Sequence, residues 1–278
     1  MNYNMTMKCN KDNYLKSYIE VRSLVFKIRE NRNIAPFQEY FRGQVSDTYS
    51  LIPGLSRKFF DQESLIQVER LLMEDFKKEM KANNKTDKLL LHKNPVDFQN
   101  DWAWLVQAQH FRLPTRMLDW TLCWKNALYF AVEEQIKEKE YLNSHDGQFW
   151  LFYVPDEFIM VNENQDLYYR TDPYKFYDTG FLNPSFLWTD NFENETAERR
   201  RARQHGKFSI QSTLDALTPL EKQKSINPYL KKFLIPSDAK SQIRLDLAKE
   251  GITGDFLYVG EDDTINDIIS SIKKKYGL

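Results

Sequence analysis

The stretch QAQHFRLPTRMLDWT, from Gln107 to Thr121, decides the fold because it joins two amphipathic helices. The first helix is predicted over about residues 95–110, and Pro114 prevents it from continuing. Thr121 can cap the second helix, whose apolar residues recur at helical spacing: Trp124, Ala127, Leu128, Ala131, Val132 and Ile136. The stretch is therefore predicted to be a rigid connector held at both ends. The polar residues 133–140 are predicted to be the solvated end of the second helix.

The same connector carries charges among apolar side chains, which is unusual unless the charges are paired or functional. Arg116 and Asp119 are three residues apart and could form an ion pair that braces the two helices. Gln109 and Thr115 add hydrogen-bonding groups, and four convergent polar residues exceed what a brace requires. Two interpretations stay open: a structural brace, or the wall of an active site.

The remaining pattern predicts a mixture of helices and strands. Helices are expected over about residues 14–29, 61–81 and 236–251, and a last helix opens at Thr264 and carries an apolar stripe to Ile272. Strands are expected at 36–44, 147–155, 207–211 and 254–260. No regular alternation of strand and helix is present. We therefore predict an α+β fold with a short central β-sheet flanked by amphipathic helices, in which an N-terminal helical segment (1–35) precedes one compact domain (36–278).

Composition excludes several classes of protein. The 278 residues include 39 Lys and Arg against 40 Asp and Glu, so a globally basic surface is not indicated. The cysteines, Cys9 and Cys123, are far apart and no Cys/His cluster exists, so no metal is expected. No signal peptide is recognisable, and the longest apolar run, FWLFYV, is too short to span a bilayer. A cytoplasmic protein with no membrane partner is expected.

Two other segments have residues suited to a site. In YFRGQ (Tyr40–Gln44), Arg42 stands where a predicted strand reaches a Gly turn, so its guanidinium could hold a phosphate or a carboxylate, or simply pair with a surface acid. In RRRARQHGKF (Arg199–Phe208), Gln204 could lie at the edge of a site. The basic run Arg199–Arg203 is either a solvated face or a nucleic-acid contact.

These three segments, in this order, resemble the FRG domain family, which is named for the triplet found here at Phe41–Gly43. The resemblance includes the central block Gln109–Ala131, the block Arg201–Phe208 and the tail Ile235–Ile252. One mismatch lies near Arg112, where the family more often has glycine. Family members occur in bacteria and phages near defence or toxin-like genes, which implies an effector role and an antitoxin or defence partner.

A weaker resemblance is to ADP-ribosyltransferases of the arginine-serine-glutamate type. It implies NAD as the cofactor, an acceptor that is a protein or a nucleic acid, and an ADP-ribosyltransferase-like fold. The residues that it implies for catalysis are Arg42, Thr115, Arg116, Asp119 and Gln204. Those that it implies for NAD binding are Tyr40, Arg42, Gly43, Gln109, His110 and Trp120.

The chain departs from this second resemblance at the third motif, which lacks an obvious Glu. Gln204 can form hydrogen bonds but supplies no charge, so Glu195, Glu198 or Asp119 could be the acid. Two alternatives to an NAD-dependent transferase or glycohydrolase stay open. One is a nucleic-acid-binding or nuclease-like module that uses Arg199–Arg203, and the other is a non-catalytic interaction domain.

Overall fold

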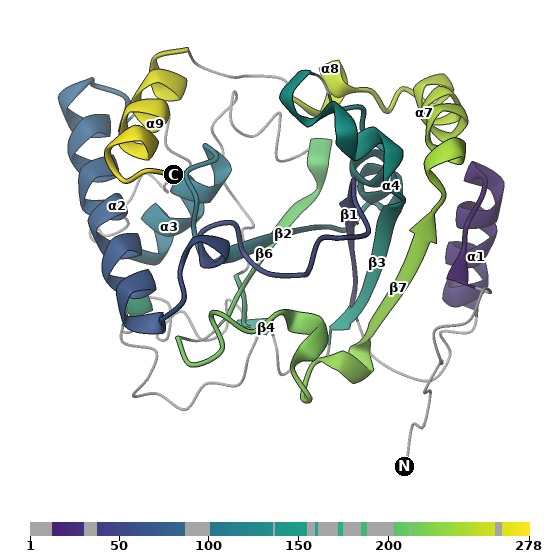
Figure 1. Ribbon diagram of the computed structural model, residues 1–278, viewed down its shortest axis with the longest axis horizontal. Coiled ribbons are helices and arrows are strands. Elements are labelled where there is room, and N and C mark those ends of the chain that lie inside the picture. Colours follow the sequence, from purple (N-terminus) through teal and green to yellow (C-terminus); the bar gives the residue numbers. More distant parts are fainter. Residues whose placement is uncertain are drawn as a thin grey trace.

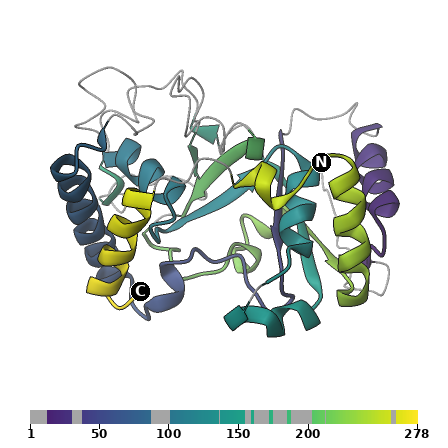
Figure 2. The ribbon, with the colours of Figure 1, turned by 90° about the horizontal axis from the view of Figure 1, so that it is seen from above.

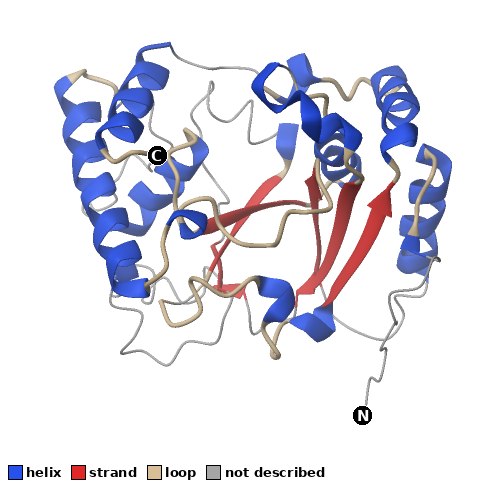
Figure 3. Ribbon diagram, viewed as in Figure 1, coloured by secondary structure: helices blue, strands red, loops and turns tan. Residues whose placement is uncertain are grey.

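The fold is α+β, as predicted, with one mixed sheet between groups of helices in the computed structural model (Figure 1, Figure 3). The helices are α1 (Tyr18–Glu30), α2 (Gln62–Ala82), α3 (Asp101–His110), α4 (Trp124–Val132), α7 (Lys240–Lys249), α8 (Gly254–Leu257) and α9 (Asp263–Lys275). The structure describes residues 13–30, 38–86, 101–135, 137–154, 159–160, 172–174, 185–187, 203–211, 213–258 and 263–278. Within those ranges, no helix combines the length and the apolar character that a membrane span requires.

The sheet has the strand order β4-β5-β6-β2-β1-β3-β7, and its neighbours are antiparallel except for the parallel β4–β5 pair. Its strands are β1 (Gln38–Gln44), β2 (Met117–Thr121), β3 (Gly147–Val154), β4 (Ile159–Met160), β5 (Ser185–Leu187), β6 (Gly206–Ile210) and β7 (Leu230–Ile235). Strand β1 is registered with β3 along its whole length but with β2 only at Phe41 and Thr121. The sheet therefore forks between β1 and β2, and β2 runs at a steep angle to the β1–β3–β7 half (Figure 3).

Helices gather at both ends of the sheet. Helices α2, α3 and α9 lie together at one end, and α1 and α7 at the other, beyond α4 (Figure 1, Figure 2). The first group closes a core around Leu72, Phe76, Trp104 and Ile269. The second group packs on the sheet face that carries Phe41. The fork between β1 and β2 thus lies between these two groups of helices, and a third core with Tyr40, Trp120 and Phe152 packs across it.

Helix α4 is in direct contact with the sheet because two glycines leave room for it. A Cβ atom on Gly43 would lie 1.8 Å from the carbonyl oxygen of Ala127, and one on Gly147 would lie 2.2 Å from that of Ala131. Real Cβ atoms do not approach so closely, so any larger residue would push the helix away from the sheet. The glycine of the triplet therefore sets the distance between α4 and β1.

Two predictions of secondary structure were wrong. Residues 254–260, predicted as a strand, begin with α8 instead, because Thr253 accepts a hydrogen bond from the Phe256 amide and caps a helical turn. The connector between α3 and α4 contains β2, which pairs with β6 through five residues. Five residues are too few to show a clear alternation of apolar and polar side chains, so the strand in the connector could not be recognised from the sequence.

Candidate functional site

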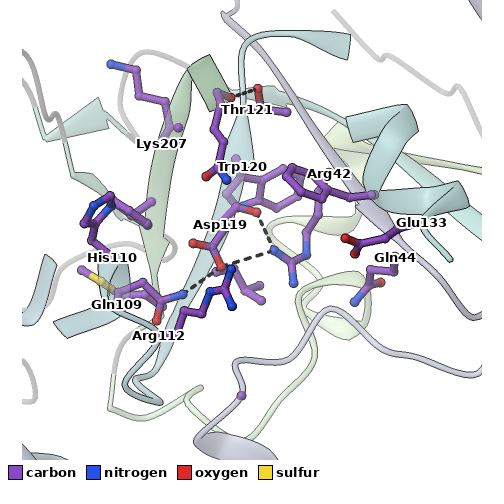
Figure 4. Close-up of a pocket in the computed structure, with 18 of the residues that line it drawn as sticks. Arg42, Gln44, Gln109, His110, Arg112, Asp119, Trp120, Thr121, Glu133 and Lys207 are labelled. Atoms are coloured by element: carbon purple, nitrogen blue, oxygen red, sulfur yellow. Dashed lines mark hydrogen bonds and ion pairs between the residues drawn. The ribbon is translucent and has the colours of Figure 1, made fainter. Parts of the chain in front are cut away.

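A cavity of about 980 Å³ opens at the fork between β1 and β2. We call it the fork pocket. Eight of the predicted site residues line it: Arg42, Gly43, Gln109, His110, Thr115, Asp119, Trp120 and Gln204. These residues come from β1, α3, the connector, β2 and the turn before β6, so the three segments that sequence analysis singled out meet at one place (Figure 4).

Arg42 lies at the base of the fork pocket, with 17% of its side chain exposed. Its Nη1 donates a hydrogen bond of 2.6 Å to the backbone oxygen of Asp119 and lies 3.9 Å from Asp119 Oδ2. Its Nε is buried and meets no hydrogen-bond acceptor in the part of the chain that the structure describes. Burial lowers the pKa of the guanidinium, and the nearby Arg57 lowers this pKa further. Arg42 is thus a desolvated cation with donor capacity left over.

A short chain of hydrogen bonds fixes the acid beside Arg42. Thr115 Oγ1 donates to Gln109 Oε1 at 2.6 Å, and Gln109 Nε2 donates to Asp119 Oδ2 at 2.8 Å (Figure 4). Thr115 itself is buried and accepts a hydrogen bond from the amide of Met117. Thr115 therefore orients the Gln109 amide, and Gln109 in turn orients the Asp119 carboxylate.

The expected pair between Arg116 and Asp119 does not form. Arg116 is fully buried, and its Nε lies 2.7 Å from Oε2 of Glu69 on α2. It also donates to the backbone oxygens of Gln211 and Pro173. Side chains alternate along β2, so Arg116, just before the strand, is turned into the core next to α2. Arg116 lies outside the lining of the fork pocket. The buried ion pair that was expected with Asp119 forms with Glu69 and joins α2 to the start of β2.

Two predicted NAD-binding residues have buried rings. Tyr40 is 1% exposed, donates its hydroxyl to Gln38 Oε1 and does not line the fork pocket, so the structure does not bring it together with the other predicted site residues. Trp120 lines the pocket but is 2% exposed, and its Nε1 donates to Ser209 Oγ. Arg42 lies on the same face of β1 as Tyr40 but farther along the strand, and it lines the pocket, whereas Tyr40 packs with Trp150 and Phe152.

Gln204 lies at the edge of the fork pocket and ties it to the C-terminal part of the chain. Its Nε2 donates to the backbone oxygen of Leu257, and its own backbone oxygen accepts from Thr121 Oγ1. Of the basic run, the structure describes Arg203, whose guanidinium donates to the Phe256 carbonyl and lies 5.1 Å from the centre of the Phe256 ring. Arg199–Arg201, Ala202, Glu195 and Glu198 lie outside the described residues.

Two arginines of the fork pocket were not predicted as site residues. Arg57 lies with its guanidinium 5.2 Å from the centre of the Tyr49 ring, and burial lowers its pKa. Arg112 lies 5.1 Å from the centre of the Tyr258 ring and has a φ of 65°. That φ falls in the left-handed region that glycine favours, and the mismatch with the family pattern near Arg112 was the signal that could have identified it.

Glu133 is a further pocket residue that sequence analysis missed. It directly follows α4 and is half-buried, whereas the pattern of residues 133–140 predicted a solvated tail. Burial raises the pKa of its carboxyl, against the smaller lowering effects of a hydrogen bond from Tyr258 and of the charge of Arg112. A run of polar residues gives no sign that one member turns inward. Among the described residues, no group of three or more His, Cys, Asp or Glu side chains could hold a metal ion.

One family model matches part of this chain. The family model described as FRG domain matches residues 38–140, from the start of β1 to the segment before β3. This match supports the resemblance to the FRG domain family for the first two of the three segments, and the third segment lies outside the matched residues. Neither a curated protein nor a solved structure matches the chain.

Proposed function

Because residues 38–140 are an FRG domain whose triplet lines the fork pocket, we propose that this chain binds NAD there and transfers its ADP-ribosyl group. The observation that carries the proposal is the desolvated Arg42 at the base of an open cavity, with a buried Nε that has no described acceptor. A phosphate oxygen of a dinucleotide would supply that acceptor, since guanidinium groups bind phosphate through paired hydrogen bonds.

The charges near Arg42 favour a polyanionic ligand. Burial lowers the pKa of both Arg42 and Arg57, and the charge of Arg57 lowers the pKa of Arg42 further. The carboxylate of Asp119, 3.9 Å from Arg42 and 58% exposed, raises the pKa of Arg42 by more than Arg57 lowers it. The two guanidinium groups still repel each other in the ligand-free pocket. A pyrophosphate between them would offset that repulsion.

The size and lining of the fork pocket also suit a dinucleotide. At about 980 Å³ the cavity is at the upper end of the range for small-molecule sites. Tyr49, Phe130 and Tyr258 line it and offer apolar ring surface for the bases. The Asp119 carboxylate, held by Gln109, can accept hydrogen bonds from ribose hydroxyl groups.

The proposed chemistry breaks the bond between C1′ of the nicotinamide ribose and the ring nitrogen. Nicotinamide leaves with the bonding electron pair, an acceptor oxygen or nitrogen bonds to C1′, and the acceptor loses a proton. The developing positive charge on the ribose is stabilised by pocket carboxylates. The family resemblance suggests that such an activity serves as the effector of a bacterial defence or toxin system. The nucleic-acid alternative relies on Arg199–Arg203, and the described member, Arg203, is engaged with Phe256.

Replacement of Arg42 tests the proposal. Titration calorimetry with NAD should show binding to the unchanged protein, and Arg42→Ala should weaken the affinity about ten- to a hundredfold, since a hydrogen bond to a charged group contributes about 1.5–3 kcal/mol. Nicotinamide release should fall in parallel. Arg70→Ala is the matched control because Arg70 is exposed on α2, paired with Glu74, and lies outside the pocket lining.

The assay for transfer uses NAD labelled in its adenine half, with cell protein and with RNA as separate acceptors. Label on either acceptor identifies the acceptor class, and free ADP-ribose indicates hydrolysis. The proposal would be wrong if the unchanged, folded protein bound no NAD at low salt, or if Arg42→Ala bound NAD as well as Arg70→Ala does.

A further inference from the structure

We propose that Glu133 accepts the proton released by the attacking group when the ADP-ribosyl group is transferred. This inference rests on the proposed function, because it concerns the same pocket and the same reaction. Glu133 would be the carboxylate that the third motif of the sequence lacks. It directly follows α4 and does not belong to the segment that contains Gln204.

Glu133 and Asp119 enter the fork pocket from different elements. Asp119 is on β2 and Glu133 follows α4, and Figure 4 shows them on opposite sides of the Arg42 guanidinium. A ligand phosphate bound to Arg42 would therefore have one carboxylate on each side. Two carboxylates that flank a reacting centre can divide the work between charge stabilisation and proton transfer.

The surroundings of the two carboxylates assign these tasks. Asp119 is 58% exposed and already bound by Gln109 Nε2, with Arg42 nearby, which suits a fixed negative charge. Glu133 is half-buried, and its hydrogen-bond donor is the neutral hydroxyl of Tyr258. A carboxylate that is not neutralised by a direct cation keeps its affinity for a proton, as a general base requires.

The charged and titratable groups around Glu133 come from three elements. Arg112 belongs to the connector after α3, Tyr258 follows α8, and Tyr129 lies one turn earlier on α4 itself. Burial raises the pKa of Glu133, while Tyr258 and Arg112 lower it by smaller amounts. The balance moves its pKa toward neutrality, where a base is most effective at cellular pH.

The step balances with water or an acceptor hydroxyl as the nucleophile. The oxygen bonds to C1′ of the ribose as the bond from C1′ to nicotinamide breaks, and the ring nitrogen keeps the electron pair and loses its positive charge. The proton of the attacking O–H passes to the Glu133 carboxylate and then to solvent. ADP-ribosylated acceptor, or free ADP-ribose, and nicotinamide are the products.

The test measures NAD affinity and nicotinamide release with the full chain. Glu133→Gln should lower the rate about a hundredfold or more, as removal of a general base does, with NAD affinity unchanged. Glu74→Gln is the control: Glu74 is the same type of residue, but it is exposed on α2, paired with Arg70 at 3.4 Å, and lies outside the lining of the fork pocket. Thermal unfolding establishes that each variant is folded. If Glu133→Gln does not fold, Glu133→Asp replaces it in the same measurements.

A pH profile separates proton transfer from a purely structural role. The rate of the unchanged protein should fall on the acid side as Glu133 is protonated, and Glu133→Gln should lose that limb. Tyr258→Phe removes a hydrogen bond that lowers the pKa of Glu133, so its acid limb should move to higher pH.

The failures of this inference and of the proposed function are distinct. If the unchanged protein binds no NAD, the proposed function fails and the inference fails with it. If the protein binds NAD but releases no nicotinamide with water, protein or RNA, or if Glu133→Gln keeps the rate and the acid limb, the role of Glu133 is overturned while NAD binding stands.

Discussion

At the scale of the residue, Arg112 combines a strained backbone with a charged side chain in the fork pocket. Its φ of 65° is costly for any residue with a Cβ atom, by roughly 1–2 kcal/mol, and glycine adopts this conformation without that cost. The guanidinium lies 5.1 Å from the centre of the Tyr258 ring, and its charge lowers the pKa of Glu133. Such strain persists where the side chain contributes something else, and here it adds a cation to the fork pocket.

Two replacements of Arg112 separate the backbone from the side chain. Arg112→Gly and Arg112→Ala both remove the guanidinium, so both should weaken NAD binding to the same extent. Only glycine relieves the left-handed backbone, so Arg112→Gly should exceed Arg112→Ala in free energy of unfolding by about 1 kcal/mol. Urea unfolding followed by circular dichroism measures the difference. Equal stabilities would show that the left-handed φ is not retained in solution.

The site residues that could be predicted are those whose position depends on the helix or strand to which they belong. Arg42, Gln109 and Asp119 meet because each lies where a helix or a strand approaches the fork. The partner of Arg116 was not predictable, because Glu69 lies 47 residues away on a helix whose position depends on the whole core. Glu133 was missed for the same reason, since its burial comes from a fold around it and not from its polar neighbours in sequence.

At the scale of the element, long periodic helices were predictable and short strands were not. Helix α2 was expected over 61–81 and forms over Gln62–Ala82, because Asp61 caps it and its apolar stripe is continuous. Strand β2, in contrast, is defined by its pairing with β6, which joins residues about ninety positions apart. Tertiary pairing overrides local preference in such short strands.

The brace between α2 and the start of β2 leads to a prediction about stability. Arg116 and Glu69 are both fully buried, so Arg116→Met or Glu69→Gln alone should cost about 3–5 kcal/mol, because each change leaves the other partner buried and uncompensated. The double variant Glu69→Leu/Arg116→Met should cost less than the sum of the single changes. Denaturant unfolding measures all three variants.

The exposed pair Arg70–Glu74 on the same helix is the reference for this measurement. Its removal should cost about 0.5 kcal/mol or less, as is typical of exposed pairs one helical turn apart. If loss of Arg116 cost no more than loss of Arg70, the buried pair would not be the brace between α2 and the sheet.

At the scale of the whole molecule, the fork pocket lies between two helix-covered cores, and a third core that includes Tyr40, Trp120 and Phe152 packs across the fork. Helices α2, α3 and α9 close one core, and α1, α4 and α7 close another (Figure 2). The connection between parts distant in sequence includes a buried lysine: Lys240 on α7 donates from Nζ to the Val45 carbonyl at 2.6 Å and lies 3.4 Å from that of Leu142. Val45 follows β1 and lines the fork pocket, so the hydrogen bond from Lys240 fixes the backbone of a lining residue.

Because of Lys240, the free energy of unfolding should change with pH in the alkaline range. Burial lowers its pKa to about 8, against an ordinary value of 10.5. The unfolded chain therefore binds the proton more tightly, and stability should rise as the pH increases from about 8 to about 10. The gain should be at most about 3 kcal/mol, since one unit of pKa shift corresponds to about 1.4 kcal/mol. Above this window, buried tyrosines such as Tyr129 and Tyr258, whose pKa values burial raises, oppose the gain.

Comparison with Lys240→Met isolates this contribution, because the tyrosines are common to both proteins. Urea unfolding across the same pH window should show stability rising more steeply with pH in the unchanged protein than in Lys240→Met. Lys249→Met, at an exposed position near the end of the same helix, should follow the unchanged protein. Parallel curves for all three proteins would mean that Lys240 stays charged between its two carbonyl partners, and that the contact between α7 and the wall of the fork pocket does not respond to pH.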